Sequence, residues 1–389
     1  MFRRQNEVKS ASAEENEKYA TKNDNIDYMN STSRNPLLTH PDDIESFIDR
    51  VSVQKILALD TEFLRVSTYF PTLCLIQLAS ADGSNALIDP LEIEADQLKL
   101  LLEKISGVFV LHSASQDLEV LSGALGFNMP RLFDTQVAYA MVGEEDQLGY
   151  AALVEKFLGV SLTKAFTRTD WCQRPLSAGQ IEYAIHDVEY LCDIHELLKA
   201  KLESSGKLNW ALEEFENRTT LAYQYSEESL FKKFRGLGDL SPIQQNKLKC
   251  LVMWREQVAQ QKNRPREWIV SNLDLLTLAK SETTTIAQLK ELKVDSRAMN
   301  RYGSQILQAF EENRDAIHSG KLIWSLKKPL TADQRTELKQ LKSRLQSIAV
   351  DYGISPGLIA NSKDLECILR EETGRLNYGW RSTVCKDLF

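Results

Sequence analysis

The sequence predicts an α/β domain, in which helices flank a mixed sheet, followed by two small all-α domains. Short apolar runs typical of buried strands stop after about residue 205. Before that point the runs first follow one another and then alternate with helical patterns, which indicates a mixed sheet. Beyond it, the apolar residues recur with helical spacing.

The bulk composition is that of a globular protein with two or three domains. The chain has 389 residues, of which 43% are apolar and 26% charged. It has no apolar run long enough for a transmembrane helix and no secretory signal, so we expect a cytoplasmic protein without a membrane partner. The six cysteines form no C-x-x-C pair, so we expect reduced thiols rather than disulfides or a zinc site. We also expect a monomer.

The elements of the sheet domain are predicted in order along the chain. Residues 1–37 are polar and predict a disordered tail. A helix begins near Pro41, because proline and acids suit a first turn and apolar residues follow at helical spacing. Three apolar runs then predict strands at 55–59, 73–79 and 86–88, with the turn Asp82-Gly83 between the last two.

Helices and one further strand complete this domain. The run 108–112 (VFVLH) predicts a buried strand. Helices are predicted at 98–105, 116–125, 137–141, 150–157 and 180–198. Ser177, with Gln180 three residues later, predicts a capping box at the start of the last helix.

The second half of the chain contains an internal repeat at an offset of 90 residues. Leu248-Lys249 corresponds to Leu338-Lys339, and the candidate N-cap Ser241 corresponds to Thr331. The constant offset favours two similar helical domains. We therefore expect a tail (1–37), a sheet domain (38–205), a helical linker (206–239) and two helical domains (240–320 and 321–389).

Charge is distributed unevenly along the chain. The net charge is −8, with −15 in residues 1–239 and +7 in residues 240–389. A basic half suggests binding to a polyanion, and a drift of surface charge without function is an equal alternative.

Two carboxylates, Asp60 and Glu62, come directly after the first predicted strand, in the stretch LALDTEF. Residues two apart on a strand share a face, so these like charges repel unless a cation lies between them. Mg²⁺ or Mn²⁺, which prefer oxygen ligands, would meet that need. Alone, this common pattern is usually structural.

Two further segments supply acids. Asp117 falls in the first turns of the helix that follows the strand 108–112. Tyr183 and Asp187 are four residues apart, so they lie on one face of the helix that begins near Ser177. A helix holds such groups more rigidly than a loop, which suits a defined site.

These four acids and the tyrosine resemble the site of the DEDD exonucleases, in the subgroup with tyrosine in its third motif. The surrounding segments resemble bacterial ribonuclease D: LALDTEFLRVSTYFPTLCLIQLA, SASQDLEVL, FDTQ at 133–136, RTDW at 168–171 and RPL at 174–176. Residues 240–310 resemble an HRDC domain, and about 330–389 a more divergent copy.

The resemblance implies a ribonuclease H-like exonuclease fold and hydrolysis of RNA from its 3′ end, with release of 5′-mononucleotides. The implied partner is RNA with a free 3′ end, typically a transfer RNA precursor in 3′ maturation. Two divalent metal ions (Mg²⁺ or Mn²⁺) are implied, and Tyr183 would orient the attacking water. The implied metal ligands are Asp60, Glu62, Asp117 and Asp187.

Four residues are candidates for contacts with the substrate. Phe63 and Tyr69 could stack on the terminal base, with core packing as the alternative, chiefly for Phe63. Gln77 could reach a ribose hydroxyl or make a structural hydrogen bond. His112 could face the cleft, although a core position is favoured.

In the helical half, we expect Trp254, Trp268 and Tyr302 in the helical cores. The basic residues Lys262, Arg264 and Arg266 either contact RNA or form a solvated loop. Two other functions remain open: a DNA 3′-5′ exonuclease, because the same acids cut either backbone, and an RNA-binding adaptor without activity. The complete set of acids argues against the adaptor.

Overall fold

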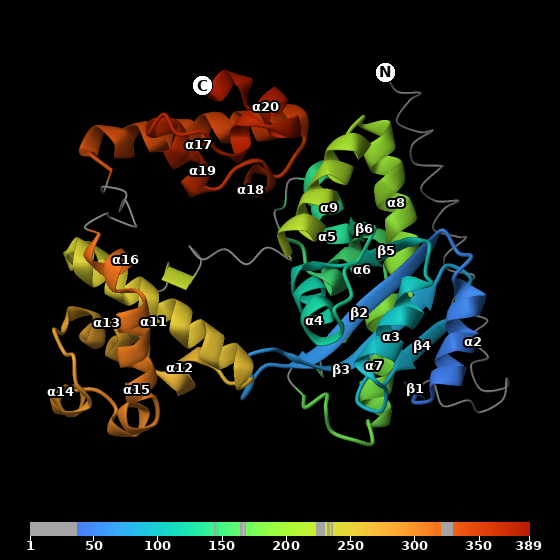
Figure 1. Cartoon of the computed structure of the whole chain (residues 1–389). Helices are drawn as coiled ribbons and strands as arrows, with labels where there is room; N and C mark the ends of the chain where they lie inside the picture. Colours follow the sequence, from blue (N-terminus) through green and yellow to red (C-terminus); the bar gives the residue numbers. More distant parts are fainter. Residues whose placement is uncertain are drawn as a thin grey trace.

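The computed structural model describes residues 37–319 and 330–389, except 144, 146, 164–165, 167–168, 223–229, 232–233 and 235. A six-stranded sheet flanked by helices is followed by two separate groups of helices (Figure 1). The mixed α/β fold followed by a helical region is therefore confirmed. The expected disordered tail, apart from Leu37, lies outside the described residues.

The sheet has the order β1-β4-β3-β2-β5-β6. Three antiparallel strands form its centre: β2 (Ile56–Leu64), β3 (Thr72–Ser80) and β4 (Asn85–Ile88). The short strands β1 (Leu37–Leu38), β5 (Val108–Leu111) and β6 (Leu132–Asp134) pair in parallel at the two sides.

Strand β2 continues further than the sequence pattern predicted. The apolar run ends at Leu59, but pairing with β3 continues to Leu64. Asp60 and Glu62 therefore lie within a paired strand rather than after it. Strands β1 and β6 were not predicted, because two or three residues are too short for a periodic signal.

Eight helices of the described chain belong to the sheet domain. They are α2 (Pro41–Val51), α3 (Ala95–Glu103), α4 (Ser115–Leu125), α5 (Thr135–Val142), α6 (Tyr150–Leu158), α7 (Ala178–Glu189), α8 (Leu191–Ser204) and α9 (Leu208–Ala222). The segment 180–198, predicted as one helix, is divided between α7 and α8 at Tyr190. The predicted capping box of Ser177 and Gln180 is present.

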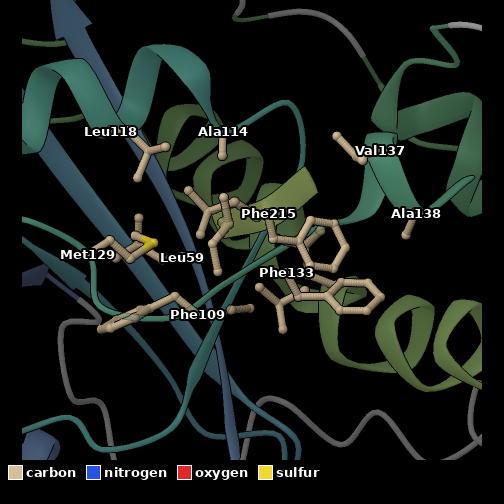
Figure 2. Packing of buried hydrophobic residues seen from close by; sticks show 14 of the residues in the cluster. Leu59, Phe109, Ala114, Leu118, Met129, Phe133, Val137, Ala138 and Phe215 are labelled. Carbon is tan, nitrogen blue, oxygen red and sulfur yellow. The ribbon is translucent and has the colours of Figure 1, made fainter. Parts of the chain in front are cut away.

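One apolar core lies between the sheet and helices α4, α5, α8 and α9 (Figure 2). Leu59 from β2, Phe109 from β5 and Leu118 from α4 are fully buried in it. The rings of Phe133 and Phe215 lie 4.9 Å apart, which joins β6 to α9. Burial of each large apolar side chain stabilises the fold by about 1.5–3 kcal/mol, so the strands and helices around the site are firmly supported.

The first helical unit comprises residues 240–319 and the second residues 330–389. The first contains α11 (Pro242–Gln261), α12 (Arg266–Ile269), α13 (Asn272–Lys280), α14 (Ile286–Glu291), α15 (Ser296–Glu312) and α16 (Arg314–His318). The second contains α17 (Ala332–Tyr352), α18 (Pro356–Ile359), α19 (Ser362–Leu369) and α20 (Gly379–Val384). Single 3₁₀ turns lie at Leu237–Asp239, Arg375–Asn377 and Lys386–Leu388.

The repeat seen in the sequence corresponds to the first three helices of each unit. Ser241 and Thr331 both cap their helices through a capping box. Helices α12 and α18 end at Ile269 and Ile359, which preserves the offset of 90 residues. At the same offset α14 overlaps α20 only in part, and within the described residues no α-helix of the second unit corresponds to α15.

The second helical unit packs against the sheet domain. Its residues Leu341 and Leu345 join the same apolar core as the sheet. Lys207, just before α9, donates a hydrogen bond of 2.8 Å to the carbonyl oxygen of Gly353. Glu214 of α9 forms a buried ion pair with Arg381 of α20. No described helix combines the length and the apolar character needed to cross a bilayer.

Candidate active site

A cavity of about 550 Å³ opens where β2, α4, α6 and α7 meet, and we call it the acidic pocket. It brings together four acids that are far apart in the sequence. Its lining consists of Asp60, Thr61, Glu62, Phe63, His112, Ser113, Ser115, Gln116, Asp117, Tyr150, Tyr183, Asp187 and Leu191. Within the described residues no Lys or Arg lines it, so no basic side chain balances the four carboxylates.

Strand β2 and two helices deliver the acids. Asp60 and Glu62 share one face of β2, as expected from their spacing. Thr61, on the other face, donates a hydrogen bond of 2.5 Å to Oδ1 of Asp117, which ties α4 to the strand. Asp187 lies one turn after Tyr183 on α7.

The pocket raises the pKa of all four acids. Burial is the main cause for Asp60, whose pKa is raised further by the charges of Asp117, Asp187 and Glu62. Burial raises the pKa of Glu62 to about 8, with the charge of Asp187 as the next contribution. Burial also raises the pKa of Asp187 to about 7 and that of Asp117 to about 6. The acids therefore repel one another through space.

The donor chemistry of the pocket fits hard divalent cations. Four carboxylates without a basic partner are the ligand set that Mg²⁺ or Mn²⁺ prefers. In the described part of the chain, no three His, Cys, Asp or Glu residues form a finished metal-binding cluster. The mutual electrostatic effects of the acids nevertheless require that they be close. Because they repel one another, these carboxylates are expected to move together when a cation binds.

Asp134 holds the turn that precedes Asp117. Its Oδ1 and Oδ2 atoms accept hydrogen bonds of 3.1 Å from the backbone N–H groups of Ser113 and Ala114. Ser113 has a φ of 62°, an unusual conformation for a residue other than glycine. Asp134 is fully buried and also caps α5. It therefore fixes the start of α4.

Tyr150 of α6 lines the pocket and was missed by the sequence analysis. Its hydroxyl donates a hydrogen bond of 3.1 Å to the carbonyl oxygen of His186 and accepts one of 3.3 Å from the N–H of Tyr190. These contacts lie on either side of Asp187 and hold the junction of α7 and α8. Burial, followed by the charges of Asp187 and Asp60, raises the pKa of Tyr150, so its hydroxyl stays protonated. Only its three-dimensional position reveals this role.

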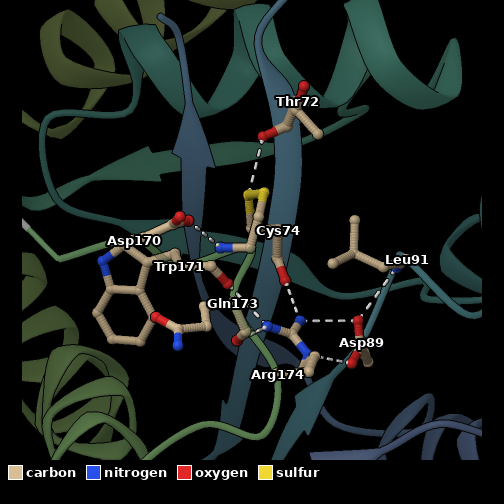
Figure 3. Close-up of a disulfide and its surroundings, with 9 residues drawn as sticks. Thr72, Cys74, Asp89, Leu91, Asp170, Trp171, Gln173 and Arg174 are labelled. Carbon is tan, nitrogen blue, oxygen red and sulfur yellow. Dashed lines mark hydrogen bonds and ion pairs between the residues drawn. A yellow bond between two sulfur atoms is a disulfide. The ribbon is translucent and has the colours of Figure 1, made fainter.

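The segment before α7 is attached to the sheet by a disulfide and an ion pair (Figure 3). Cys74 of β3 is bonded to Cys172, so the expectation that all cysteines are reduced is wrong for this pair. Cys74 and Cys172 are 98 residues apart in the sequence, so no short motif indicates the bond. Arg174 donates hydrogen bonds to the buried carboxylate of Asp89 and to the carbonyl oxygen of Cys74. This region precedes the helix that carries Tyr183 and Asp187.

Of the four candidates for substrate contacts, two line the acidic pocket. They are Phe63 and His112. Burial lowers the pKa of His112, which favours a neutral ring. Thr135 donates its hydroxyl proton to the carbonyl oxygen of Leu111, so it accepts the hydrogen bond of 2.9 Å from Nδ1 of His112.

Gln77 and Tyr69 do not line the acidic pocket. Gln77 is fully buried opposite Asp60, and neither of its amide atoms has a hydrogen-bond partner within the described residues. The alternative of a satisfied structural hydrogen bond is therefore wrong, and the contact with a ribose hydroxyl stays a prediction. Tyr69 instead contacts the first helical unit.

We call residues 65–71, between β2 and β3, the arm. The hydroxyl of Tyr69 donates a hydrogen bond to Glu256 and accepts one of 3.0 Å from Gln260 and one of 3.0 Å from Arg266. Oδ1 of Asn263 accepts hydrogen bonds of 3.1 Å from the backbone N–H groups of Tyr69 and of Phe70. The arm thus attaches the first helical unit to the strand that carries Asp60 and Glu62.

Comparisons with known families agree with this architecture. A family model described as 3′-5′ exonuclease matches residues 37–203, and the HRDC domain model matches residues 244–310. The HRDC match falls within the first helical unit.

Curated relatives and a solved structure are similar over almost the whole chain. A ribonuclease D of Gluconacetobacter diazotrophicus is 33% identical, covering 90% of this chain and 91% of the relative. A ribonuclease D of Desulfotalea psychrophila is 30% identical, covering 91% and 97%. The crystal structure of Escherichia coli RNase D, described as an exoribonuclease involved in structured RNA processing, superposes with a TM-score of 0.79 at 29% identity, covering 90% of this chain and 96% of that chain.

Proposed function

The chain belongs to the ribonuclease D family of 3′-5′ exoribonucleases, and on that premise we propose that its acidic pocket hydrolyses RNA one 5′-mononucleotide at a time. The observation that carries this proposal is the meeting of four mutually repelling carboxylates and a tyrosine in one cavity. Such a site is electrostatically incomplete without cations, and the family of exonucleases depends on divalent metal ions.

The proposed ligands divide between two cations. Asp60 would help to hold both, because its charge interacts with those of the other three acids. Glu62 and Asp187 would help to hold one ion, and Asp117 the other. When bound, the ions would lower the pKa of a water molecule and stabilise the leaving 3′-oxygen. Thr61 keeps Asp117 in place and favours its charged form through the hydrogen bond to Oδ1.

Tyr183 is proposed to orient the attacking water. It lies one helical turn before Asp187 and lines the same pocket. Its ring packs 6.0 Å from that of the buried Trp171, which limits its movement. A tyrosine hydroxyl normally has a pKa of about 10, so positioning of the water explains its presence better than proton abstraction does.

The proposed substrate is RNA with a free 3′ end, and transfer RNA precursors are the specific candidate. Phe63 would stack on the terminal base, and His112 would contact the substrate from its place in the same pocket. The Escherichia coli relative is described as an exoribonuclease involved in structured RNA processing, which supports this class. We further propose that the protein is cytoplasmic, because such precursors are made in that compartment. We also propose that it is a monomer. Cell fractionation and light scattering would check compartment and mass.

The test is digestion of matched RNA and DNA oligomers that have free 3′ ends, with Mg²⁺, with Mn²⁺ and with chelator. We expect single-nucleotide shortening of RNA with metal and none with chelator. The variants Asp60→Ala and Asp187→Ala should lose at least about 100-fold in rate, because even changes to residues that only contact the metal ligands commonly lose 10- to 100-fold. RNA binding should remain.

Three results would contradict the proposal. An active Asp187→Ala enzyme would overturn the assignment of the site. Faster digestion of DNA than of RNA would favour the DNA exonuclease. RNA binding without hydrolysis under all metal conditions would favour the adaptor.

A further inference from the structure

Trp268 is exposed on the first helical unit, contrary to the expectation that it lies in the helical core. Its exposed fraction is 59%, whereas Trp171 and Trp380 are 3% and 2% exposed. It belongs to the short helix α12, which follows the loop 262–265. A large aromatic ring in water forgoes the free energy of burial, so its exposure needs a reason.

The surroundings of Trp268 are cationic rather than apolar. The guanidinium of Arg264 lies 5.8 Å from the centre of the indole ring. Lys262 and Arg264 are both exposed, and neither has an ion-pair partner within the described residues. Arg266, in contrast, is paired with Glu256. An unpaired cation beside an exposed ring, with a second one in the same loop, offers contacts to phosphate and base together.

The same loop is fixed to the catalytic domain. Asn263, between Lys262 and Arg264, accepts the two hydrogen bonds from the arm. The arm also contacts α4: Arg65 pairs with Glu119 at 2.7 Å, and the ring of Phe70 lies against Gly123. Trp268 is therefore held in a defined relation to the elements that carry Asp60 and Asp117.

We propose that Trp268, Arg264 and Lys262 form a binding site for single-stranded RNA outside the acidic pocket. A base stacks on the indole, and the neighbouring phosphates pair with the two cations. The site would hold the strand upstream of the 3′ end that is being cut. This inference rests on the proposed function. RNA is favoured over a protein partner because the unpaired Arg264 lies beside the ring and the unpaired Lys262 belongs to the same loop, in a half of the chain with a net charge of +7.

The experiment measures binding of a 5′-fluorescein single-stranded RNA 20-mer to the full chain in chelator, where no hydrolysis occurs. The variant Trp268→Ala should weaken binding by about 5- to 100-fold, because stacking on one aromatic residue has that effect. Trp268→Phe should restore most of the affinity. Arg264→Gln should reduce the dependence of log affinity on log salt by about one unit.

The matched control is Tyr378→Ala, which removes another exposed aromatic ring, 66% exposed, from the second helical unit. It should leave the affinity unchanged. Cleavage of a dinucleotide, which has no further strand upstream of the bond that is cut, should be the same in the wild type and in Trp268→Ala. Because Trp268 is exposed, its replacement should also leave the melting temperature unchanged.

Unchanged affinity in Trp268→Ala would overturn the inference and leave this face to a protein partner. An equal loss in Tyr378→Ala would also overturn it. Either result is separate from the proposed function, which fails only if the wild type does not shorten RNA when metal is present.

Discussion

The buried acid Glu214 and the four acids of the acidic pocket form two groups with opposite surroundings. Glu214 on α9 receives hydrogen bonds from Arg381 and, at 2.8 Å, from the indole N–H of Trp380. Although burial opposes ionisation, these partners lower the pKa of Glu214. The acids of the acidic pocket have no basic partner among the described residues, and their pKa values are raised. The first group is complete within the chain, whereas the second requires a ligand of opposite charge.

The largest expected effect comes from breaking the complete group. Arg381→Ala leaves the carboxylate of Glu214 buried without its cation, so the free energy of unfolding should fall by about 3–5 kcal/mol. Chemical denaturation of the two proteins measures this difference. Arg375→Ala is the control, because Arg375 is exposed beside Asp364 and should change stability by less than about 1 kcal/mol. Equal losses would mean that burial of the pair is unimportant.

The incomplete group should respond in the opposite direction. At alkaline pH, where the acids of the pocket are ionised, Asp60→Asn removes one of the repelling charges without a change of shape, so in chelator it should raise the free energy of unfolding by about 1–2 kcal/mol. The same change should abolish hydrolysis. Glu119→Gln, at an exposed acid paired with Arg65, should give no such gain. If Asp60→Asn were less stable than the wild type, the repulsion inferred here would be absent.

The pH dependence sharpens the comparison. The folded pKa of Glu62 is about 8, above the ordinary value of 4.5. Its protonated form therefore stabilises the folded state fully below about pH 4.5, and this contribution is lost as the pH rises through 8. In chelator, the melting temperature of Glu62→Gln minus that of the wild type should increase from pH 5 to pH 9. Mg²⁺ should reduce the difference at pH 9 by stabilising the wild type. A constant difference would contradict the raised pKa.

Glu214 should show the reverse sign. Because its folded pKa is lowered, its ionised form stabilises the protein above the ordinary pKa of 4.5, and this is lost as the pH falls through the folded pKa. The melting temperature of the wild type minus that of Glu214→Gln should therefore shrink towards pH 3. If this difference in melting temperature instead grew at acid pH, Glu214 would have a raised pKa, like the acids of the acidic pocket.

The smallest expected effect concerns the arm. Tyr69→Phe keeps the ring but removes the hydroxyl that contacts Glu256, Gln260 and Arg266, with an expected loss of about 1 kcal/mol. Hydrogen exchange at the N–H groups of Tyr69 and Phe70 should become faster, because both are bonded to Asn263 across the same contact. Tyr378→Phe, at an exposed ring, is the control. Unchanged exchange would show that the hydroxyl does not hold the first helical unit.

The sequence predicted the residues of the acidic pocket better than the residues that hold them in place. Asp60, Glu62, Asp117, Tyr183 and Asp187 lie in short patterns whose spacing assigns a face of a strand or helix, so their meeting in one pocket could be expected. Tyr150, Asp134 and Arg174 act through contacts across the fold, and no local pattern marks them.

A helix boundary, a side-chain partner and the exposure of a tryptophan also could not be predicted from the sequence. The junction of α7 and α8 at Tyr190 contains neither proline nor glycine, so the apolar spacing alone gave one long helix. Tyr69 looked like a stacking residue because it follows the acidic motif, but its partner Glu256 is 187 residues away. Trp268 is apolar by type, and only the packing of α12 reveals that it faces water.

The position of Arg381 near the C-terminus has a consequence for synthesis on the ribosome. It lies 167 residues after Glu214, so at ordinary rates of translation Glu214 waits roughly 10–30 s for its cation. During that interval the surface of α5 and α9 that contacts α18 and α20 is still uncovered. We therefore expect the nascent catalytic domain to be most prone to aggregation and proteolysis until the second helical unit has emerged.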